Sequence, residues 1–320
     1  MNDIDFDDVR CKMRKREKIT MNEDKKILVV GSANVDMVVK AAKIPRMGET
    51  VLGGVFAKYE GGKGANQAMA ANTLFDGVVF CAGMGDDIFG RDYLSYLQKR
   101  GLDTSLVKTF KDASTGVALI TVAKEGQNII TVAPGANLLL SPEDMRAVDF
   151  SKFSHAAFQL ENSLETVREG LKLAKAAGCT TVLTPAPAKL LDDEILQNTD
   201  FLVPNEIEIL QVQRGFTSMQ NAAESLLKKG VKNVITTLGE RGCALFNADG
   251  EKRYPALSVR PIDTVGAGDC FTGSLLAGFR RFGDVDTAIK FASAAAALKI
   301  TKVGAQSFSP LKEVLKMMEK

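Results

Sequence analysis

The segment DTVGAGD, residues 263–269, places three small residues directly before an aspartate at the start of a helix-forming run. Backbone N–H groups at a helix start have no partner within the helix, and with the helix dipole they attract anions such as phosphate. Gly266, Ala267 and Gly268 would let a phosphate approach that backbone closely. A carboxylate repels phosphate, so Asp269 is best explained as a base that removes a proton from a hydroxyl attacking the phosphorus. The alternative is a glycine turn in which Asp269 is an ordinary residue of the first helical turn.

A second polar cluster, GGKGANQA at residues 61–68, opens another helical pattern. Its glycines permit a tight approach of the backbone to a small polar ligand, and Lys63 and Asn66 offer hydrogen-bond donors. The cluster is not a Walker A loop, because that motif requires GxxxxGK followed by serine or threonine. The alternative is a flexible turn with an exposed lysine.

Further polar residues follow strand-like segments, which is where open parallel sheets bind their ligands. Asn34 and Asp36, in NVD, could donate to and accept from vicinal hydroxyls of a sugar, although a capping or turn role fits Asp36 equally well. Asn205 and Glu208, in PNEIE, are three residues apart and share one face if helical. Such a pair suits a hydrated Mg²⁺ ion, which prefers oxygen ligands, but an N-capped and solvated helix start is the alternative.

The hydrophobic pattern supplies the elements that would bring these clusters together. Buried strands are expected at 27–36, 78–87, 155–160, 181–184, 201–203, 233–237 and 243–246, and helices at 64–75, 90–100, 164–177, 206–213, 219–229, 291–300 and 310–319. Strands that alternate with helices predict an α/β fold, with a central, mainly parallel sheet flanked by helices on both faces.

Two regions interrupt this alternation, at about 37–58 and 114–133. Both are typical of strands in a smaller, separate sheet, and the second is predicted to be a hairpin with EG in its turn. We expect them to form a lid on one main domain that spans residues 27–320. Residues 1–26 are dense in charge, with acidic residues before basic ones, unlike a transit peptide, and are expected to be a flexible extension.

The composition limits the kinds of partner. Apolar residues make up 45% of the chain and charged residues 25%, as in soluble globular proteins. A net charge of +2 gives no broad basic surface for nucleic acid or an anionic membrane. No apolar run reaches the roughly 18 residues of a membrane span. The five cysteines lack paired spacing and follow no secretory signal: Cys11, Cys81, Cys179, Cys243 and Cys270. Reduced thiols in the cytoplasm are therefore expected, and the same pattern does not distinguish the cytoplasm from the nucleus.

The single histidine, His155, rules out several mechanisms. Zinc sites built from several histidines are excluded. His155 lies in FSHAAFQL, a pattern typical of a buried strand, so a structural role is favoured over membership of a Ser-His-Asp triad. Carboxylates, amides, lysine and backbone groups must then carry any catalysis.

The motifs GSANVD, GGKGANQA, STGVA, PAPA, PNE, TLGERG, DTVGAGD and KVGAQ occur in this order between about residues 26 and 315. This ordered set resembles the ribokinase-like (phosphofructokinase-B type) sugar kinases. DTVGAGD is specific to that superfamily, and GGKGANQA with GSANVD points to its ribose-phosphorylating members. The resemblance implies ATP-dependent phosphorylation of D-ribose at O5, giving D-ribose 5-phosphate and ADP.

The resemblance also implies roles for individual residues. Asp269 would be the general base on the ribose 5-hydroxyl, and the backbone N–H groups of Gly266, Ala267 and Gly268 would form an anion hole. The ribose pocket would comprise Asn34, Asp36, Gly62, Lys63, Gly64, Ala65, Asn66 and Glu161. ATP would contact Asn205, Thr237, Leu238, Gly239, Glu240, Arg241, Gly242, Gly268 and Ser293. Asn205 and Glu208 would organise Mg²⁺ through water.

The sugar kinases of this family use a monovalent cation, usually K⁺, beside the anion hole. Its ligands here would be the Asp263 carboxylate and backbone oxygens of Val265, Lys299, Lys302 and Gly304. The cation would hold these carbonyls and so shape the anion hole without touching substrate. A serine that often completes the set aligns with Phe308, so Ser309, or alternatively Ser307, would be the last ligand.

Two further positions depart from the family pattern: Thr184 precedes PAPA where asparagine is common, and Ser293 replaces a histidine that commonly lies against adenine. The resemblance also implies a homodimer that pairs through the lid sheets. Two alternatives stay open. One is a kinase for another small sugar or nucleoside, such as fructose, deoxyribose or adenosine, and the other is a non-catalytic sensor of sugar or nucleotide.

Overall fold

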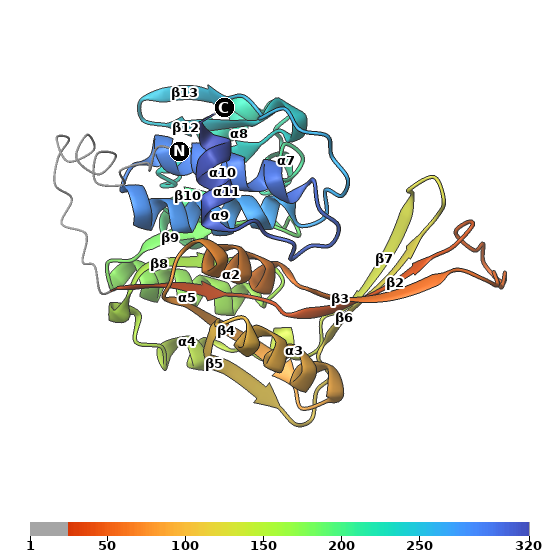
Figure 1. The fold of residues 1–320 in the computed structure, drawn as a ribbon. Coiled ribbons are helices and arrows are strands. Elements are labelled where there is room, and N and C mark those ends of the chain that lie inside the picture. Colours follow the sequence, from red (N-terminus) through yellow and green to blue (C-terminus); the bar gives the residue numbers. More distant parts are fainter. Residues whose placement is uncertain (1–24, 320) are drawn as a thin grey trace, which may run out of the picture.

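The computed structural model describes residues 25–319, which form a large sheet covered by helices on both faces and a small sheet that projects from this body (Figure 1). The extension expected over residues 1–26 lies outside the described residues except for Lys25 and Lys26, and Lys26 already begins the first strand. Cys11 also lies outside them, and the four described cysteines are buried and unpaired. Among the helices of this range, none is long and apolar enough to cross a bilayer.

The large sheet contains nine strands within residues 25–319, in the order β13-β12-β11-β10-β9-β8-β1-β4-β5. Their bounds are β1 (Lys26–Val30), β4 (Val78–Gly85), β5 (Asp103–Phe110), β8 (Phe153–Phe158), β9 (Thr180–Leu183), β10 (Phe201–Leu202), β11 (Asn233–Thr237), β12 (Cys243–Asn247) and β13 (Gly250–Tyr254). From β11 to β5 all neighbours pair in parallel, whereas β12 and β13 are antiparallel additions. The predicted mainly parallel α/β sheet is confirmed, and the carboxyl ends of its parallel strands share one edge.

Strand β1 shows why the sheet is covered on both faces. Ile27 and Val29 pack into one hydrophobic core and Leu28 and Val30 into another, because successive side chains of a strand point to opposite faces. All four are at most 1% exposed. A continuous apolar run of this kind is typical of a parallel strand with helices above and below it.

Two groups of helices cover these cores. One core receives α2 (Lys63–Leu74), α3 (Ile88–Lys99), α9 (Ala267–Phe282) and α10 (Val285–Lys299), and the other receives α4 (Pro142–Arg146), α5 (Leu164–Ala176), α6 (Asp193–Gln197), α7 (Glu208–Gln211) and α8 (Met219–Lys228). Helix α11 (Leu311–Met318) packs against α10, and three short 3-10 helices, η1 (Gly135–Leu139), η2 (Phe150–Lys152) and η3 (Gly239–Arg241), lie in connections. Helices α2 and α9 pack closely, and Gly273 permits this because it has no Cβ. A Cβ there would lie only 2.3 Å from the Gln67 carbonyl oxygen.

The small sheet has the order β3-β2-β6-β7. Its strands are β2 (Asn34–Lys40), β3 (Val55–Gly61), β6 (Gly116–Val122) and β7 (Asn128–Ala133). Strands β6 and β7 form the predicted hairpin, with Gly126 at a φ of 88° in the turn. The strands expected within about 37–58 are β2 and β3 of this sheet; they begin three residues earlier, because NVD already belongs to β2, and end three residues later, and the connection at 41–54 contains no strand.

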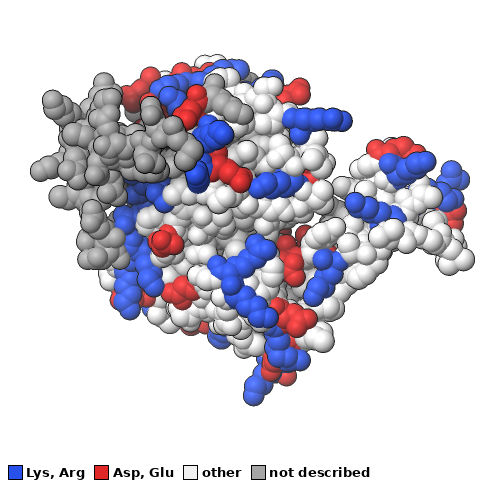
Figure 2. Space-filling model, viewed as in Figure 1, with Lys and Arg blue, Asp and Glu red and all other residues white. Residues whose placement is uncertain are grey.

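Other differences from the predicted elements have simple causes. The helix expected at 206–213 is only the four-residue α7. Strands β5 and β13 were missed because neither has a buried apolar run: β5 is half-exposed, and four of the five residues of β13 are exposed. On the face of the body drawn in Figure 2, positive and negative side chains are interspersed.

Candidate active site

Asp269 lies in the first turn of α9 and is buried against the start of α2. Its Oδ2 accepts a hydrogen bond of 3.0 Å from Nδ2 of Asn66, and its Oδ1 accepts one of 3.2 Å from Nε2 of Gln67. The two amides orient the carboxylate. Because an ionised carboxylate can accept about four hydrogen bonds, capacity remains for a substrate hydroxyl.

Gln67 joins Asp269 to a set of buried polar side chains that the sequence did not identify as functional. Its Oε1 accepts a hydrogen bond of 2.7 Å from Nε2 of Gln159, and its Nε2 also lies 3.2 Å from Oγ1 of Thr184. Gln159 follows β8 and Thr184 follows β9, so both extend from carboxyl ends of the sheet. The signal that could have found them is this position after two buried strands.

Asn66 is supported from its other side by Gln306, in the KVGAQ motif. Nε2 of Gln306 donates to Oδ1 of Asn66 at 3.1 Å and contacts the Tyr93 hydroxyl at 2.8 Å. The Tyr93 hydroxyl donates to the Gly61 carbonyl at 2.7 Å. Because Oδ1 of Asn66 accepts from Gln306, its Nδ2 is directed toward Asp269.

The expected anion hole lies at the start of α9. Gly266 is the N-cap residue at a φ of 74°, a left-handed conformation that favours glycine. A Cβ at Gly266 would lie 2.9 Å from the Ala305 carbonyl oxygen, whereas a Cβ at Gly268 would meet nothing within 4 Å. The N–H of Ala267 donates to the Thr264 carbonyl at 3.1 Å in this structure. The surface above Gly268 therefore has room for a ligand, and the Ala267 N–H would have to exchange its partner to bind one.

The glycines of the lysine-containing loop allow two backbones to pack together. A Cβ at Gly64 would lie 2.5 Å from the Ser32 nitrogen, and Gly62 has a φ of 89°. The N–H of Ala65 donates to the Ser32 carbonyl at 2.9 Å. The loop is thus fixed against the end of β1, and the flexible-turn alternative does not describe it.

Glu161 and Asn34 face this loop. Oε2 of Glu161 accepts from the Lys63 N–H at 3.0 Å and from the Ser32 hydroxyl. Oδ1 of Asn34 accepts a hydrogen bond of 2.7 Å from Nδ2 of the buried Asn137. Asn137 was not identified from the sequence, and its contact leaves the Nδ2 group of Asn34 as the donor for a ligand.

Asp36 and Lys63 have opposite electrostatic environments. Burial, with the nearby carboxylates of Glu161 and Asp269, raises the pKa of Asp36 to about 7. The carboxylate of Asp269 raises the pKa of Lys63 above its usual range, although burial opposes this effect. Lys63 is therefore the cation that balances the carboxylates of this site, and a proton on Asp36 can do so in part near neutral pH.

The segments expected to contact ATP are neighbours at the same edge of the sheet. Asn205 forms an isolated parallel bridge with Thr237, which begins the TLGERG segment. The N–H of Leu238 donates to the Gly242 carbonyl at 2.8 Å, so that this segment forms a closed turn. Within it, Arg241 forms an ion pair with Glu206. Ser293, on α10, lies close to Cys243 on β12, and burial raises the pKa of the Cys243 thiol to about 11.

Asn205 and Glu208 form the reciprocal bonds of a capping box. Oδ1 of Asn205 accepts from the Glu208 N–H at 2.8 Å, and Oε2 of Glu208 accepts from the Asn205 N–H at 2.8 Å. Burial raises the pKa of Glu208. The N-cap alternative therefore holds for the single amide oxygen of Asn205, which also accepts from the Ile207 N–H at 2.9 Å, and for one oxygen of Glu208. The second carboxylate oxygen of Glu208 suits a water-mediated Mg²⁺ contact. Residues 25–319 contain no group of three or more His, Cys, Asp or Glu side chains placed to hold a metal directly.

The residues expected to bind K⁺ come together but do not fit a bound ion. Nζ of Lys299 donates to the carbonyl of Asp263 at 3.0 Å and to that of Val265. Nζ of Lys302 donates to Oγ of Ser309 at 2.7 Å. Two of the expected ligands, the Val265 carbonyl and the Ser309 hydroxyl, are thus already bound by ammonium groups, as is the carbonyl of Asp263. Burial lowers the pKa of Lys299, and the charge of Asp263 opposes that change.

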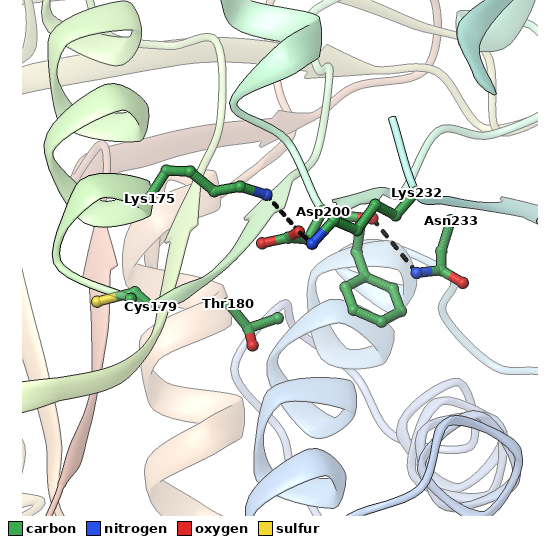
Figure 3. Close-up of a pocket in the computed structure, with 8 residues that line it drawn as sticks. Lys175, Cys179, Thr180, Asp200, Lys232 and Asn233 are labelled. Atoms are coloured by element: carbon green, nitrogen blue, oxygen red, sulfur yellow. Dashed lines mark hydrogen bonds and ion pairs between the residues drawn. The ribbon is translucent and has the colours of Figure 1, made fainter. Parts of the chain in front are cut away.

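A hollow of about 340 Å³ lies at the opposite edge of the sheet, at the amino ends of β9, β10 and β11 (Figure 3). Asp200 is buried there and is satisfied by Lys175, by Lys232 at 2.8 Å and by the Thr181 N–H at 3.0 Å. It is a structural ion-pair cluster. His155, also near this edge, stacks on Phe279, and burial lowers its pKa to about 4, which confirms the predicted structural role.

Comparison with known proteins identifies the relatives of this arrangement. The family model described as pfkB family carbohydrate kinase matches residues 24–312. The chain is 39% identical to a deoxyribokinase of Salmonella typhi, covering 89% of this chain and 95% of that protein. It is 36% identical to a ribokinase of Haemophilus influenzae, covering 92% and 99%. The structure of Arabidopsis thaliana ribokinase complexed with ribose and ATP superimposes with a TM-score of 0.85 at 28% identity, covering 92% of this chain and 99% of that one.

Proposed function

The chain belongs to the pfkB family of carbohydrate kinases, and on that premise we propose that it transfers the γ-phosphoryl group of ATP to the 5-hydroxyl of D-ribose. The products are D-ribose 5-phosphate and ADP. One observation carries the proposal. The buried carboxylate of Asp269 accepts a hydrogen bond from Asn66 of the lysine-containing loop, and Asp269 itself lies at the helix start suited to bind phosphate.

Asp269 acts as the general base. Its carboxylate accepts the proton of ribose O5 as O5 bonds to the γ-phosphorus, and the bond from that phosphorus to the β–γ bridging oxygen breaks, releasing ADP. The N–H groups and dipole at the start of α9 stabilise the charge of the moving phosphoryl group. Asn66 and Gln67 keep the carboxylate aligned, which is a positioning role.

The sugar is held by both hydrogen-bond donors and hydrogen-bond acceptors. Asn34 donates through Nδ2, Lys63 donates through its ammonium, and Asp36 accepts from vicinal hydroxyls in its ionised form. Glu161 is supported by the Lys63 N–H and completes the pocket. Buried polar groups of this kind favour a ligand that pairs with each of them and disfavour one that leaves a partner unpaired.

ATP occupies the edge formed by Asn205, Thr237 and the turn at 238–242. Asn205 and Glu208 would hold Mg²⁺ through water, and the ion would supply positive charge to the phosphates. The fit rests on the bridge between Asn205 and Thr237 and on the second carboxylate oxygen of Glu208, which the capping box leaves available. Ser293 lies beside this edge, close to Cys243.

2-Deoxyribose is a second candidate substrate, because a deoxyribokinase is 39% identical to this chain. A panel of ribose, deoxyribose, fructose, tagatose and adenosine tests the assignment through substrate-dependent ADP release. Ribose is expected to give the highest kcat/KM. A different best substrate would overturn the assignment to ribose, and ATP binding without turnover on any of them would favour a sensor.

The small sheet is proposed as a lid over the sugar and as the contact between two copies of the chain. Its residues Asn34 and Asp36 belong both to β2 and to the sugar pocket, so the sheet is attached directly to the site. Apolar side chains exposed on it include Phe56, Leu119 and Ile129. A requirement for K⁺ stays a prediction from family resemblance, and the contacts of Lys299 and Lys302 argue against it.

A further inference from the structure

Lys299 ends α10 and directs its ammonium group into the loop that precedes α9. The residue is fully buried, at 0% exposure. Its Nζ donates to the carbonyl oxygens of Asp263 and Val265. The carboxyl end of a helix favours a cation, and an ammonium buried among carbonyls is satisfied by those contacts.

The Val265 carbonyl is the contact through which Lys299 can affect chemistry. The Val265 C=O and the Gly266 N–H belong to one peptide unit, which is planar and rigid. A cation that holds the oxygen therefore also sets the direction of the N–H at the start of α9. Lys299 is in this sense a positioning residue: it touches neither sugar nor nucleotide, and it acts on the group that would touch the phosphate.

Two further groups of the expected monovalent-cation site, the Asp263 carboxylate and the Lys299 carbonyl, also have partners within the chain. Oδ1 of Asp263 accepts from the Val265 N–H at 2.9 Å, and Oδ2 accepts from the Gly304 N–H at 2.8 Å. The Lys299 carbonyl accepts from the Lys302 N–H at 2.9 Å. These hydrogen bonds hold the two loops together around the ammonium group without an ion.

The last ligand position leads to the same conclusion. Phe308 packs against the hydrophobic cores and offers no oxygen there. The neighbouring Ser309 accepts from Nζ of Lys302, and the Ser307 hydroxyl donates to the Val303 carbonyl. Neither serine hydroxyl is directed to the carbonyls that Lys299 occupies.

We propose that the tethered ammonium group of Lys299 takes the place of the monovalent cation, so that the enzyme works without K⁺. The inference rests on the proposed kinase function for its activity readout. One positive charge on oxygen ligands is what the ion would contribute, and a lysine side chain carries the same charge with three N–H donors. The chain has exchanged a dissociable ion for a covalently attached one.

The test compares wild type with Lys299→Ala and Lys299→Met in KCl, NaCl and tetramethylammonium chloride at one ionic strength. Ribose-dependent ADP release by the wild type should be the same in all three salts. Lys299→Ala, which vacates the space, should lose at least about tenfold in kcat without K⁺, since removing a donor of an anion hole outright costs about 10²–10³. K⁺ should restore much of that loss, whereas Lys299→Met, which fills the space, should stay slow.

Thermal unfolding gives a second readout that does not depend on turnover. K⁺ should raise the melting temperature of Lys299→Ala above that in tetramethylammonium and leave the wild type unchanged. The control is Lys290→Ala, an exposed lysine on the same helix, which should behave as wild type in both assays.

Failure of the two proposals can be told apart. A wild type that turns over ribose only with K⁺, or that K⁺ stabilises against heat, overturns the role of Lys299 and leaves the kinase function standing. A wild type that turns over no sugar in any salt counts against the kinase function, and the melting experiment still decides the role of Lys299. If both Lys299 variants fail to fold, the response of the wild type to K⁺ decides it.

Discussion

Nδ2 of Asn66 donates a hydrogen bond of 3.0 Å to Oδ2 of Asp269, although 203 residues separate them in the sequence. The contact joins the first turn of α2, in the lysine-containing loop, to the first turn of α9. A sugar bound at the loop and a phosphate bound at α9 would therefore meet at one carboxylate. The general-base role proposed for Asp269 depends on this contact between the two motifs, and neither motif defines it alone.

Replacing Asp269 by Asn should abolish most of the kinase activity. The amide keeps the size of the carboxylate but cannot accept the proton of the 5-hydroxyl, and loss of a general base costs about 10²–10⁴ in rate. The measurement is ribose-dependent ADP release at saturating ATP. Asp249→Asn, in the exposed turn between β12 and β13, is the control and should retain full activity. Activity of Asp269→Asn within tenfold of wild type would contradict the assignment of the base.

Gln67→Leu should lower kcat more than it changes KM for ribose. Gln67 holds Oδ1 of Asp269 and accepts from Gln159, so its loss misaligns the base and leaves a buried donor without its partner. An unsatisfied buried group costs about 1–3 kcal/mol, so the melting temperature should also fall. Steady-state kinetics and thermal unfolding measure the two effects. Gln98→Leu, at an exposed position on α3, is the control. An unchanged kcat in Gln67→Leu would show that Asn66 alone aligns the base.

Sequence patterns located the motifs that come just after a buried parallel strand. NVD follows β1, PNE follows β10 and TLGERG begins at the end of β11, and the carboxyl ends of parallel strands share one edge. GGKGANQA instead follows β3 of the small sheet, and DTVGAGD follows a strandless segment after β13, so strand ends alone do not place these two motifs. The sheet itself was predictable because β1 and β4 are continuous apolar runs. The edge strand β13 was not predictable, because four of its five residues are exposed and it has no apolar run.

The supporting residues were harder to predict for a physical reason. Asn137 has no local pattern of its own. Gln159 follows a buried strand and Gln306 belongs to KVGAQ, but their roles, like that of Asn137, arise from contacts with residues far away in the sequence. The side chain of Lys299 is the clearest case. The family resemblance implied that the backbone oxygen of Lys299 binds a cation. Only the direction of its side chain reveals that an ammonium group lies beside the Asp263 carbonyl.

The two glycines of the anion hole should respond differently to alanine. Gly266→Ala should destabilise the fold by about 1–2 kcal/mol, the cost of a left-handed conformation for a residue with a Cβ, because Gly266 has a φ of 74°. Gly268→Ala should leave the melting temperature unchanged or slightly higher, since its Cβ would meet nothing within 4 Å. Its methyl group should instead hinder the phosphate and lower kcat. Thermal unfolding and ADP release separate the two effects, and a Gly268→Ala variant with full activity would show that phosphate does not approach there.

Asp36→Asn should become more stable relative to wild type as the pH rises from 5 to 8. The folded-state pKa of Asp36 is raised to about 7, so the folded protein keeps a proton that the unfolded chain has already lost. Wild-type stability therefore falls as pH rises through this interval, by an amount on the order of a few kcal/mol. Asn has no such titration. The measurement is the difference in melting temperature between Asp36→Asn and wild type at pH 5 and at pH 8, without ribose. Asp112→Asn, in an exposed loop, is the control. A difference in melting temperature that does not increase with pH would contradict the raised pKa of Asp36. Ribose turnover by Asp36→Asn should be weak at either pH.

Replacing apolar residues on one face of the small sheet by Glu should convert a dimer into monomers. Phe56 pairs with Val39 across β3 and β2, and Leu119 pairs with Met37 across β6 and β2, so all four side chains share one face. Phe56 is 62% exposed and Leu119 is 55% exposed in the single chain, and apolar side chains gathered on one face favour burial against a partner. Sedimentation velocity should show wild-type dimers and monomeric Phe56→Glu and Leu119→Glu variants. Leu190→Glu, at an exposed apolar position outside the sheet, should stay dimeric. A monomeric wild type at assay concentrations would overturn the proposed pairing through the lid, and a Leu190→Glu monomer would move the interface away from it.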